Sequence, residues 1–233
     1  VVTANELGVS ESVVETFLEP TNSDTHPIGN ASLNYGTYLT EPFFFIMFQI
    51  VILTTMVYAL GTESSHGKEW LTTANNNIFT AIVGKAVPYV CSFVASGMAA
   101  LYIMSKIGTL TWGLVGAMVG LVVASTSLAL FIYSLYPHMA LILSAVSMIG
   151  SLGATLSGVT FPINSMYPIF RHLALLMPIR HFTIITQNIF YTEGGYGAVW
   201  QHIAMLASFC LLPFITATRL RKSIISGSYE KSK

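Results

Sequence analysis

Arginine and histidine stand side by side twice in the second half of the chain, as Arg171-His172 and Arg180-His181. Imidazole groups can bind metals, and basic side chains can anchor a helix at the lipid headgroups, so these pairs are the first candidates for a functional role. None of the six histidines has the spacing of a metal site, and His202 stands alone. We therefore predict no metal site, and we interpret the two pairs as anchors of short helices at the lipid headgroups.

Lys85 is the only lysine or arginine that falls inside one of the long apolar runs. An ionisable residue within a membrane is a functional candidate by default. Lys85 lies about two helical turns from the start of its run, so its side chain can reach the membrane interface. This structural role is favoured, and a direct role in transport stays open.

Motifs of known enzymes are missing from the apolar runs. The runs contain neither Gly-x-Ser-x-Gly nor His-Glu-x-x-His, and their interiors contain no Asp or Glu. Cys91 and Cys210 lie within such runs, where we expect small apolar core residues. We predict no catalytic residue and no enzymatic activity in this chain.

The elements that carry these groups must face lipid. Of 233 residues, 53% are hydrophobic and only 9% are charged, whereas soluble domains carry about 25% charged residues. So few charges cannot cover a water-facing surface, and no basic face is available for nucleic acid.

Five apolar runs are long enough to cross a membrane as helices, which takes about 20 residues each. They are Pro42–Leu60, Ile78–Met104, Leu110–Tyr133, Met139–Leu156 and Val199–Ala217. Backbone groups in lipid must be hydrogen-bonded within the protein, so these runs predict helices. The predicted fold class is all-α, a polytopic membrane protein with about five transmembrane helices.

Three parts follow from this reading: the end of an external soluble region over 1–41, a transmembrane domain over 42–222 and a cytoplasmic tail over 223–233. The chain has no initiator methionine, so we expect it to begin inside a longer protein.

Charge asymmetry predicts the orientation. A cytoplasmic tail places most of the ten lysines and arginines inside, as the positive-inside rule requires: Lys68, Lys85, Arg219, Arg221, Lys222, Lys231 and Lys233. The acidic segment 1–41 then lies outside. We predict a multi-pass protein of the cell's inner (plasma) membrane.

The segment 157–198 is too apolar for a solvated loop and too rich in proline for one spanning helix. Broken helices are tolerated at membrane depth where protein buries them. We predict an external re-entrant hairpin of two short helices.

Small residues recur at one-turn spacing in the third and fourth runs: Gly116, Gly120 and Ala124, then Gly150, Ala154 and Gly158. Such faces let helices approach closely in lipid. Packing within the chain is favoured, and packing against a second copy stays open.

The loop after the first run, residues 61–73, is patterned as a short amphipathic helix. Trp70 and Leu71 can lie in the membrane interface while Glu63, Lys68 and Glu69 face water. The helix is either an interfacial anchor or a docking surface for a cytoplasmic partner.

Two stretches resemble the ABC-2 permease family of exporters. The longer comprises Ser157-Gly158-Val159-Thr160-Phe161-Pro162, Met166 and Pro168, followed by Met177-Pro178-Ile179-Arg180-His181-Phe182. The shorter comprises Glu63, Gly67, Leu71 and Gly84-Lys85, with Lys68 where the family has threonine. The resemblance covers about residues 40–222, and it implies the C-terminal portion of a permease.

The resemblance also implies roles and partners. Two permease units would form the pathway, as a homodimer or heterodimer, and separate ATPase subunits would bind ATP and Mg. The coupling element would comprise Glu63, Gly67, Lys68, Glu69 and Leu71, and the external gate Phe161, Pro162, Met166 and Pro168. No Walker A motif is present, so no cofactor is expected in this chain.

The expected function is therefore ATP-driven export of a lipid-like, drug-like or other amphipathic cargo. Two alternatives stay open: a non-transporting membrane scaffold or assembly protein, and an ion-driven carrier.

Overall fold

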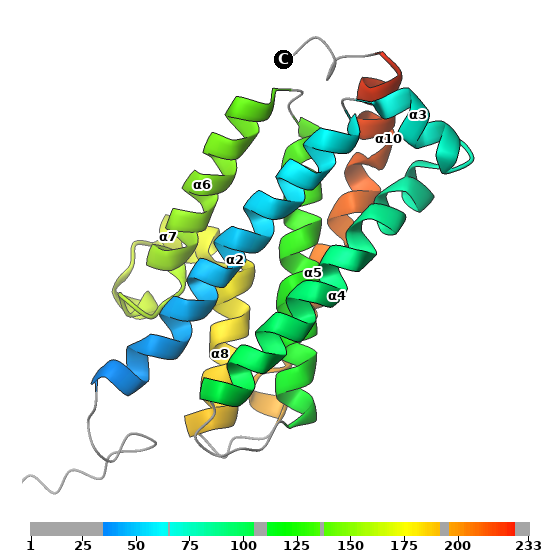
Figure 1. Cartoon of the computed structure of the whole chain (residues 1–233). Coiled ribbons are helices and arrows are strands. Elements are labelled where there is room, and N and C mark those ends of the chain that lie inside the picture. The colour runs from blue at the N-terminus through cyan, green and yellow to red at the C-terminus, as the bar shows by residue number, and fades with distance from the viewer. Residues whose placement is uncertain (1–34, 65, 105–110, 136–137, 192–195, 227–233) are drawn as a thin grey trace, which may run out of the picture. The chain divides into compact units, whose positions relative to one another are not determined.

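The computed structural model describes residues 35–64, 66–104, 111–135, 138–191 and 196–226 (Figure 1). All regular elements in these residues are helices, which confirms the predicted fold class. The predicted external region lies mostly outside the described residues, and so does most of the predicted tail.

Five described helices are long and apolar enough to cross a membrane, as the sequence predicts: Leu39–Ser64, Ile78–Met104, Trp112–Leu135, Met139–Leu156 and Trp200–Ile225. They correspond to α2 (Tyr35–Ser64), α4 (Ile78–Met104), α5 (Trp112–Leu135), α6 (Met139–Leu156) and the joined elements α9 (Trp200–Ser208), η4 (Phe209–Leu211) and α10 (Leu212–Ile225). The bounds of the second and fourth runs are those predicted from the sequence.

The first helix begins earlier than predicted, at Tyr35 instead of Pro42. Pro42 lies inside α2, where it removes one backbone donor without ending the helix. Glu41, expected in the external segment, is therefore part of the helix and is buried. The absence of acidic residues is predicted for the interiors of the spans, and Glu41 lies at the start of the span Leu39–Ser64.

The last span is interrupted at its middle. Pro213 follows the 3-10 turn η4 and stands in the first turn of α10. Its ring cannot donate to the preceding turn and would clash there, so the helix tightens for one turn before it continues. This span reaches Ile225, further than the predicted Ala217, because the Arg-Lys segment 219–222 is itself helical.

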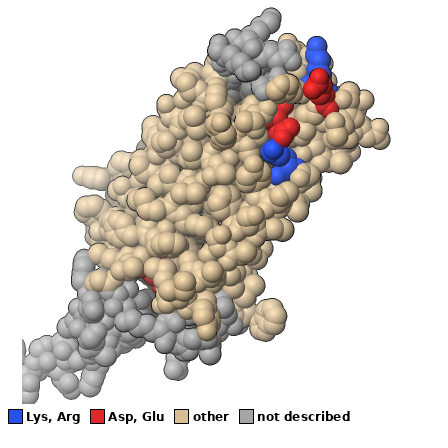
Figure 2. All heavy atoms as spheres, viewed as in Figure 1, with Lys and Arg blue, Asp and Glu red and all other residues tan. Residues whose placement is uncertain are grey.

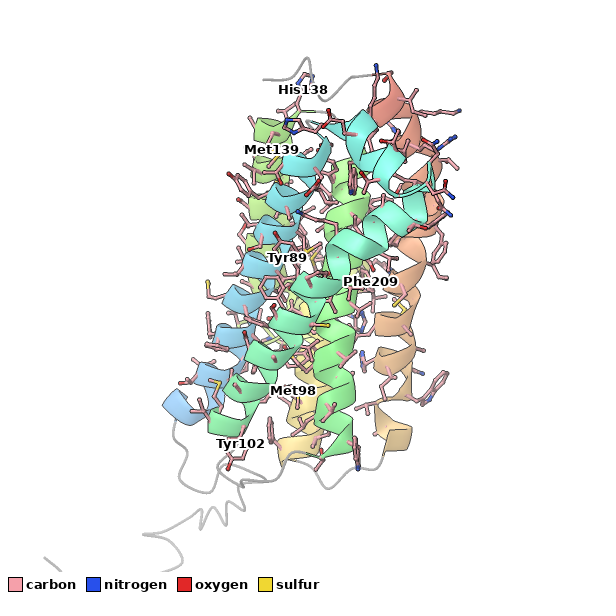
Figure 3. The ribbon with its side chains drawn as sticks, turned by 45° about the vertical axis from the view of Figure 1, so that its right-hand side comes forward. Tyr89, Met98, Tyr102, His138, Met139 and Phe209 are labelled. Atoms are coloured by element: carbon pink, nitrogen blue, oxygen red, sulfur yellow. The ribbon has the colours of Figure 1, made fainter. Side chains whose placement is uncertain are left out.

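α5 is the centre of the bundle. In the most apolar stretch of α5, 67% of the residues are buried, whereas only 17% are buried in the corresponding stretch of α4. In Figure 1 it runs behind α2 and α4, and its packing partners include α2, α10, α8 and α4. Phe209 of η4, labelled in Figure 3, belongs to the part of the last span that packs against α5, and its side chain is buried.

The predicted hairpin contains η2 (Ile163–Ser165), α7 (Pro168–Ala174) and α8 (Pro178–Tyr191). Gly158 has φ +92°, a conformation that glycine adopts without steric cost and that ends α6. α7 is largely exposed, whereas α8 is packed among α5, α9, α6 and α2. The 3-10 turn η3 (Tyr196–Ala198) leads into α9.

The short helix predicted after the first span is present as α3 (Gly67–Thr73). In Figure 1 it lies at the end of the bundle where α10 also ends, which we call the α3 end. At this end Met139 of α6 lies beside α2 (Figure 3), and a side chain on Gly61 would meet its Cε atom at 2.9 Å.

The small residues predicted to pack helices closely do so in part within the chain. A Cβ atom on Gly150 would stand 2.6 Å from Cγ1 of Ile50 in α2, and one on Gly120 would stand 3.3 Å from Leu206 in α9. A Cβ atom on Gly116 would meet no atom within 4 Å.

These contacts make a matched pair of substitutions informative. Gly150→Ala is expected to be less stable than Gly116→Ala by about 1–3 kcal/mol, because only the first alanine overpacks an interface. Both gain the same helix propensity, about 1 kcal/mol. Thermal unfolding of the purified variants in detergent measures the difference, and equal midpoints would contradict the α2–α6 contact.

Candidate functional site

Charged side chains gather at the α3 end on the face that Figure 2 shows, over α3 and the adjoining parts of α2 and α4. The charged residues of these elements are Lys68 and Glu69 of α3 and the pair Glu63 and Lys85. Most of the remaining face in Figure 2 carries neither sign of charge. Charges in a membrane protein concentrate where water is accessible, so this end is the natural place for an aqueous partner.

Glu63 and Lys85 form an ion pair that joins α2 to α4. Lys85 Nζ lies 2.5 Å from Glu63 Oε1, and the side chains are 23% and 33% exposed. The same ammonium group lies 5.8 Å from the centre of the Tyr89 ring, within cation–π range. Lys85 therefore has a partner within the protein, and Glu63 does not simply face water as expected.

α3 is fastened to the bundle at its first residue and at its middle. Leu71 is buried, and a Cβ atom on Gly67 would stand 2.6 Å from Cγ2 of Ile224 in α10. Beside it, Ser64 at the end of α2 is hydrogen-bonded to Tyr133 of α5. Lys68 and Glu69 are exposed, and Trp70 is half-buried. The predicted coupling residues thus divide into an inner set that contacts the spans and an outer pair.

A hollow of about 310 Å³ opens between α3 and α4. It is lined by Glu63, Trp70, Thr73, Ala74, Thr80, Ala81, Gly84 and Lys85. Its walls include the ion pair and the half-buried Trp70, so an inserted side chain would contact both helices at once.

The residues predicted as a gate lie in the α6–α7 connection and at the start of α7. Phe161, Pro162 and Pro168 are exposed, and Met166 is half-buried against the core. Arg171 of α7 donates to the carbonyl oxygens of Met166 and Asn164, at 2.9 and 2.6 Å. These two hydrogen bonds of Arg171 hold the connection in a compact loop. The role of the loop as a gate stays a prediction.

The second Arg-His pair is buried inside the protein and is not exposed as a headgroup anchor would be. His181 is fully buried in the first turns of α8, and its Nδ1 lies 2.9 Å from Nδ1 of His202 in α9. His202 is therefore not isolated, as the sequence reading had it. The burial of α8 between other helices brings together two rings that are 21 residues apart.

Burial lowers the pKa of His181, and the neighbouring charge of Arg180 acts in the same direction, so the ring is neutral near pH 7. Its Nε2 lies 2.9 Å from the carbonyl oxygen of Leu175, which can only accept a hydrogen bond. Nε2 therefore carries the proton, Nδ1 accepts, and Nδ1 of His202 donates.

Arg180 is also buried, with 9% of its surface exposed. Within the described residues its Nε and Nη1 atoms have no hydrogen-bond partner. Glu41, which is buried in α2, contacts Thr186 of α8, the helix that also carries Arg180. No sequence signal distinguished the buried Arg180 from the exposed Arg171, because the burial of Arg180 depends on how α8 packs in the bundle.

A model of a protein family described as "ABC-2 family transporter protein" matches residues 5–219. The chain belongs to the ABC-2 transporter family. Searches of curated proteins and of solved structures return no match. The family confirms the resemblance carried by the Ser157–Phe182 stretch, and its match also extends towards the N-terminus.

Membership in the ABC-2 family settles the broad class of the chain. It is the membrane permease of an ABC transporter, a multi-pass protein, and permeases of this kind work with an ABC ATPase. The α3 end and the buried start of α8 are then two sites on one permease, with the long helix α2 in contact with both.

The ion pair at the α3 end can be measured by a double-mutant cycle with Glu63→Gln and Lys85→Met. We expect a coupling energy of about 0.5–1 kcal/mol, since both side chains are partly exposed to solvent. Thermal or denaturant unfolding in detergent provides the four stabilities. A parallel cycle of Glu63→Gln with Lys68→Met, an exposed lysine of α3, should give no coupling; equal values in both cycles would contradict the pair.

Proposed function

We propose that this chain is the permease subunit of an ATP-driven exporter, which moves an amphipathic cargo outward while a separate ATPase binds ATP and Mg. Membership in the ABC-2 family carries the proposal. In its expected orientation the N-terminal segment lies outside, the tail is cytoplasmic, and the protein resides in the plasma membrane. A second permease, identical or different, completes the pathway.

The α3 end is the proposed coupling element. Exposed Lys68 and Glu69 offer an ion-pairing surface to the ATPase, and the hollow between α3 and α4 can receive one of its side chains. A push on α3 reaches α2 through the short connection, α10 through Gly67 and Ile224, and α4 through the Glu63–Lys85 pair. Three spans would then move together.

The opposite half of the chain supplies the proposed exit. Phe161, Pro162, Met166 and Pro168 form the compact loop beside α7, and they would move aside as the gate. An apolar groove of about 360 Å³ between α5, α8 and α9 supports an amphipathic cargo. The groove is lined by Gly113, Gly116, Ala117, Val119, Gly120, Val123, Ile185, Ile203, Leu206, Ala207 and Cys210.

An ion-driven carrier is a second candidate because Glu41 is buried within α2. A buried carboxyl group in a membrane helix can take up and release a proton or a cation. Transport that continues without ATP hydrolysis but stops in Glu41→Gln would favour the carrier. A scaffold role would leave transport absent under both conditions.

The coupling role of Glu63 is tested with the permease and its ATPase reconstituted together in liposomes. Glu63→Gln is expected to reduce both cargo transport and the stimulation of ATP hydrolysis by about fivefold or more, because the link between α2 and α4 is lost. The exchanged pair Glu63→Lys with Lys85→Glu should recover much of the activity. Unchanged transport in Glu63→Gln would count against the proposal.

The docking surface is tested by exchanging its two charges, Lys68→Glu with Glu69→Lys. Both side chains are exposed, so stability should stay within about 0.5 kcal/mol of the parent chain. Co-purification with the ATPase at low salt should fall, because the charge pattern is inverted. Arg171→Gln, on α7, serves as the control and should retain the ATPase; loss in both variants would indicate a general effect.

A further inference from the structure

The start of α8 carries a positive charge, Arg180, where a helix normally favours a negative one. The N-terminus of a helix has a positive electrostatic potential, which favours acidic residues and anions. The first turn of α8 contains no acidic residue and instead holds Arg180, with His181 directly after it. A buried helix start that is positive and also holds a cation is unfavourable unless an anion joins it.

The guanidinium group of Arg180 is independent evidence that an anion is missing at the start of α8. It is nine-tenths buried, and among the described residues two of its three nitrogens, Nε and Nη1, donate to nothing. A buried unpaired charge is among the most destabilising features that a protein can retain. Such a group points to a ligand that supplies the missing acceptors.

The surrounding described groups do not supply the missing anion. The neighbouring His181 and His202 are close enough to feel the charge of Arg180, and neither is acidic. Glu41 contacts Thr186, which lies six residues beyond Arg180 and hence about 9 Å further along α8. The ion pair that the structure describes, Glu63–Lys85, joins α2 to α4 instead.

The apolar groove begins beside this charged site. Ile185, one helical turn after His181, lines the groove, and so does Ile203, the residue after His202. Gly113, Gly116 and Gly120 form its wall on α5. A ligand with an anionic head and an apolar chain would match both parts, whereas a small inorganic anion would use the charged part alone.

We propose that the buried start of α8 binds the phosphate group of an anionic lipid, with Arg180 as its main ligand and an acyl chain in the groove between α5, α8 and α9. His181 directly follows Arg180, and its hydrogen bond to the carbonyl oxygen of Leu175 joins the start of α8 to the end of α7. The described residues enclose Arg180, so the lipid enters when the α7–α8 hairpin moves. Binding itself needs no ATPase; the further step, that this lipid is cargo, rests on the proposed function.

Native mass spectrometry of the purified permease with added phosphatidylglycerol tests the proposal. Arg180→Gln should bind this lipid at least about tenfold more weakly, because charge-assisted hydrogen bonds are lost. Phosphatidylcholine, which has no net charge, should bind more weakly to the parent chain and change little in the variant. Arg221→Gln removes an exposed arginine of α10, outside the hairpin, and should bind like the parent chain.

Thermal stability separates a ligand site from a structural role. Without added lipid, Arg180→Gln should be as stable as the parent chain or more stable, because an unpaired buried charge is removed. Phosphatidylglycerol should raise the midpoint of the parent chain and not that of Arg180→Gln. Arg180→Lys, which keeps the charge, should retain part of the binding.

Two results would overturn the proposal. If Arg180→Gln binds phosphatidylglycerol as tightly as the parent chain, Arg180 does not bind the phosphate group of the lipid. If inorganic phosphate displaces the lipid at equal concentration, the site serves a soluble anion. A chain that binds the lipid but neither transports it nor stimulates an ATPase would contradict the proposed function and leave this site intact.

Discussion

The bundle depends on the packing of α5. Lipid cannot drive helices together by the hydrophobic effect, so close packing and small residues must hold them. α5 is buried along most of its length, and α2, α4, α8 and the last span contact it. The positions of both candidate sites follow from this packing, since each site lies between helices that pack against α5.

α2 connects the two sites. Its last turn holds Glu63 and Ser64, which bind Lys85 of α4 and Tyr133 of α5. Near its start, Phe45 packs against Phe182 of α8 at a centroid distance of 5.0 Å. A rigid helix of 30 residues extends about 45 Å, so a tilt produced at one end displaces the other. Such a lever is a physical route between an energy source and a binding site in lipid.

The buried start of α8 departs from the rules that the remaining helices obey. At the α3 end the charges are exposed or paired, and the buried Glu41 has Thr186 as a partner, whereas Nε and Nη1 of Arg180 are buried without acceptors beside a helix end of the same sign. Proteins keep such unfavourable arrangements where function requires them. The tautomers of His181 and His202 are set by one carbonyl oxygen, so the polar order of this region extends beyond the arginine.

The sequence by itself determined the membrane class, the five spans, the two-helix hairpin, the short helix after the first span and the family. These features depend on local properties: the length of apolar runs, the places of proline and glycine, and one ordered stretch between Ser157 and Phe182. Only the tertiary structure decided that Lys85 pairs with Glu63, that His181 meets His202, and that Arg180 and Glu41 are buried. In lipid, buried and exposed helix faces are both apolar, so the sequence carries no signal for the depth or rotation of a helix.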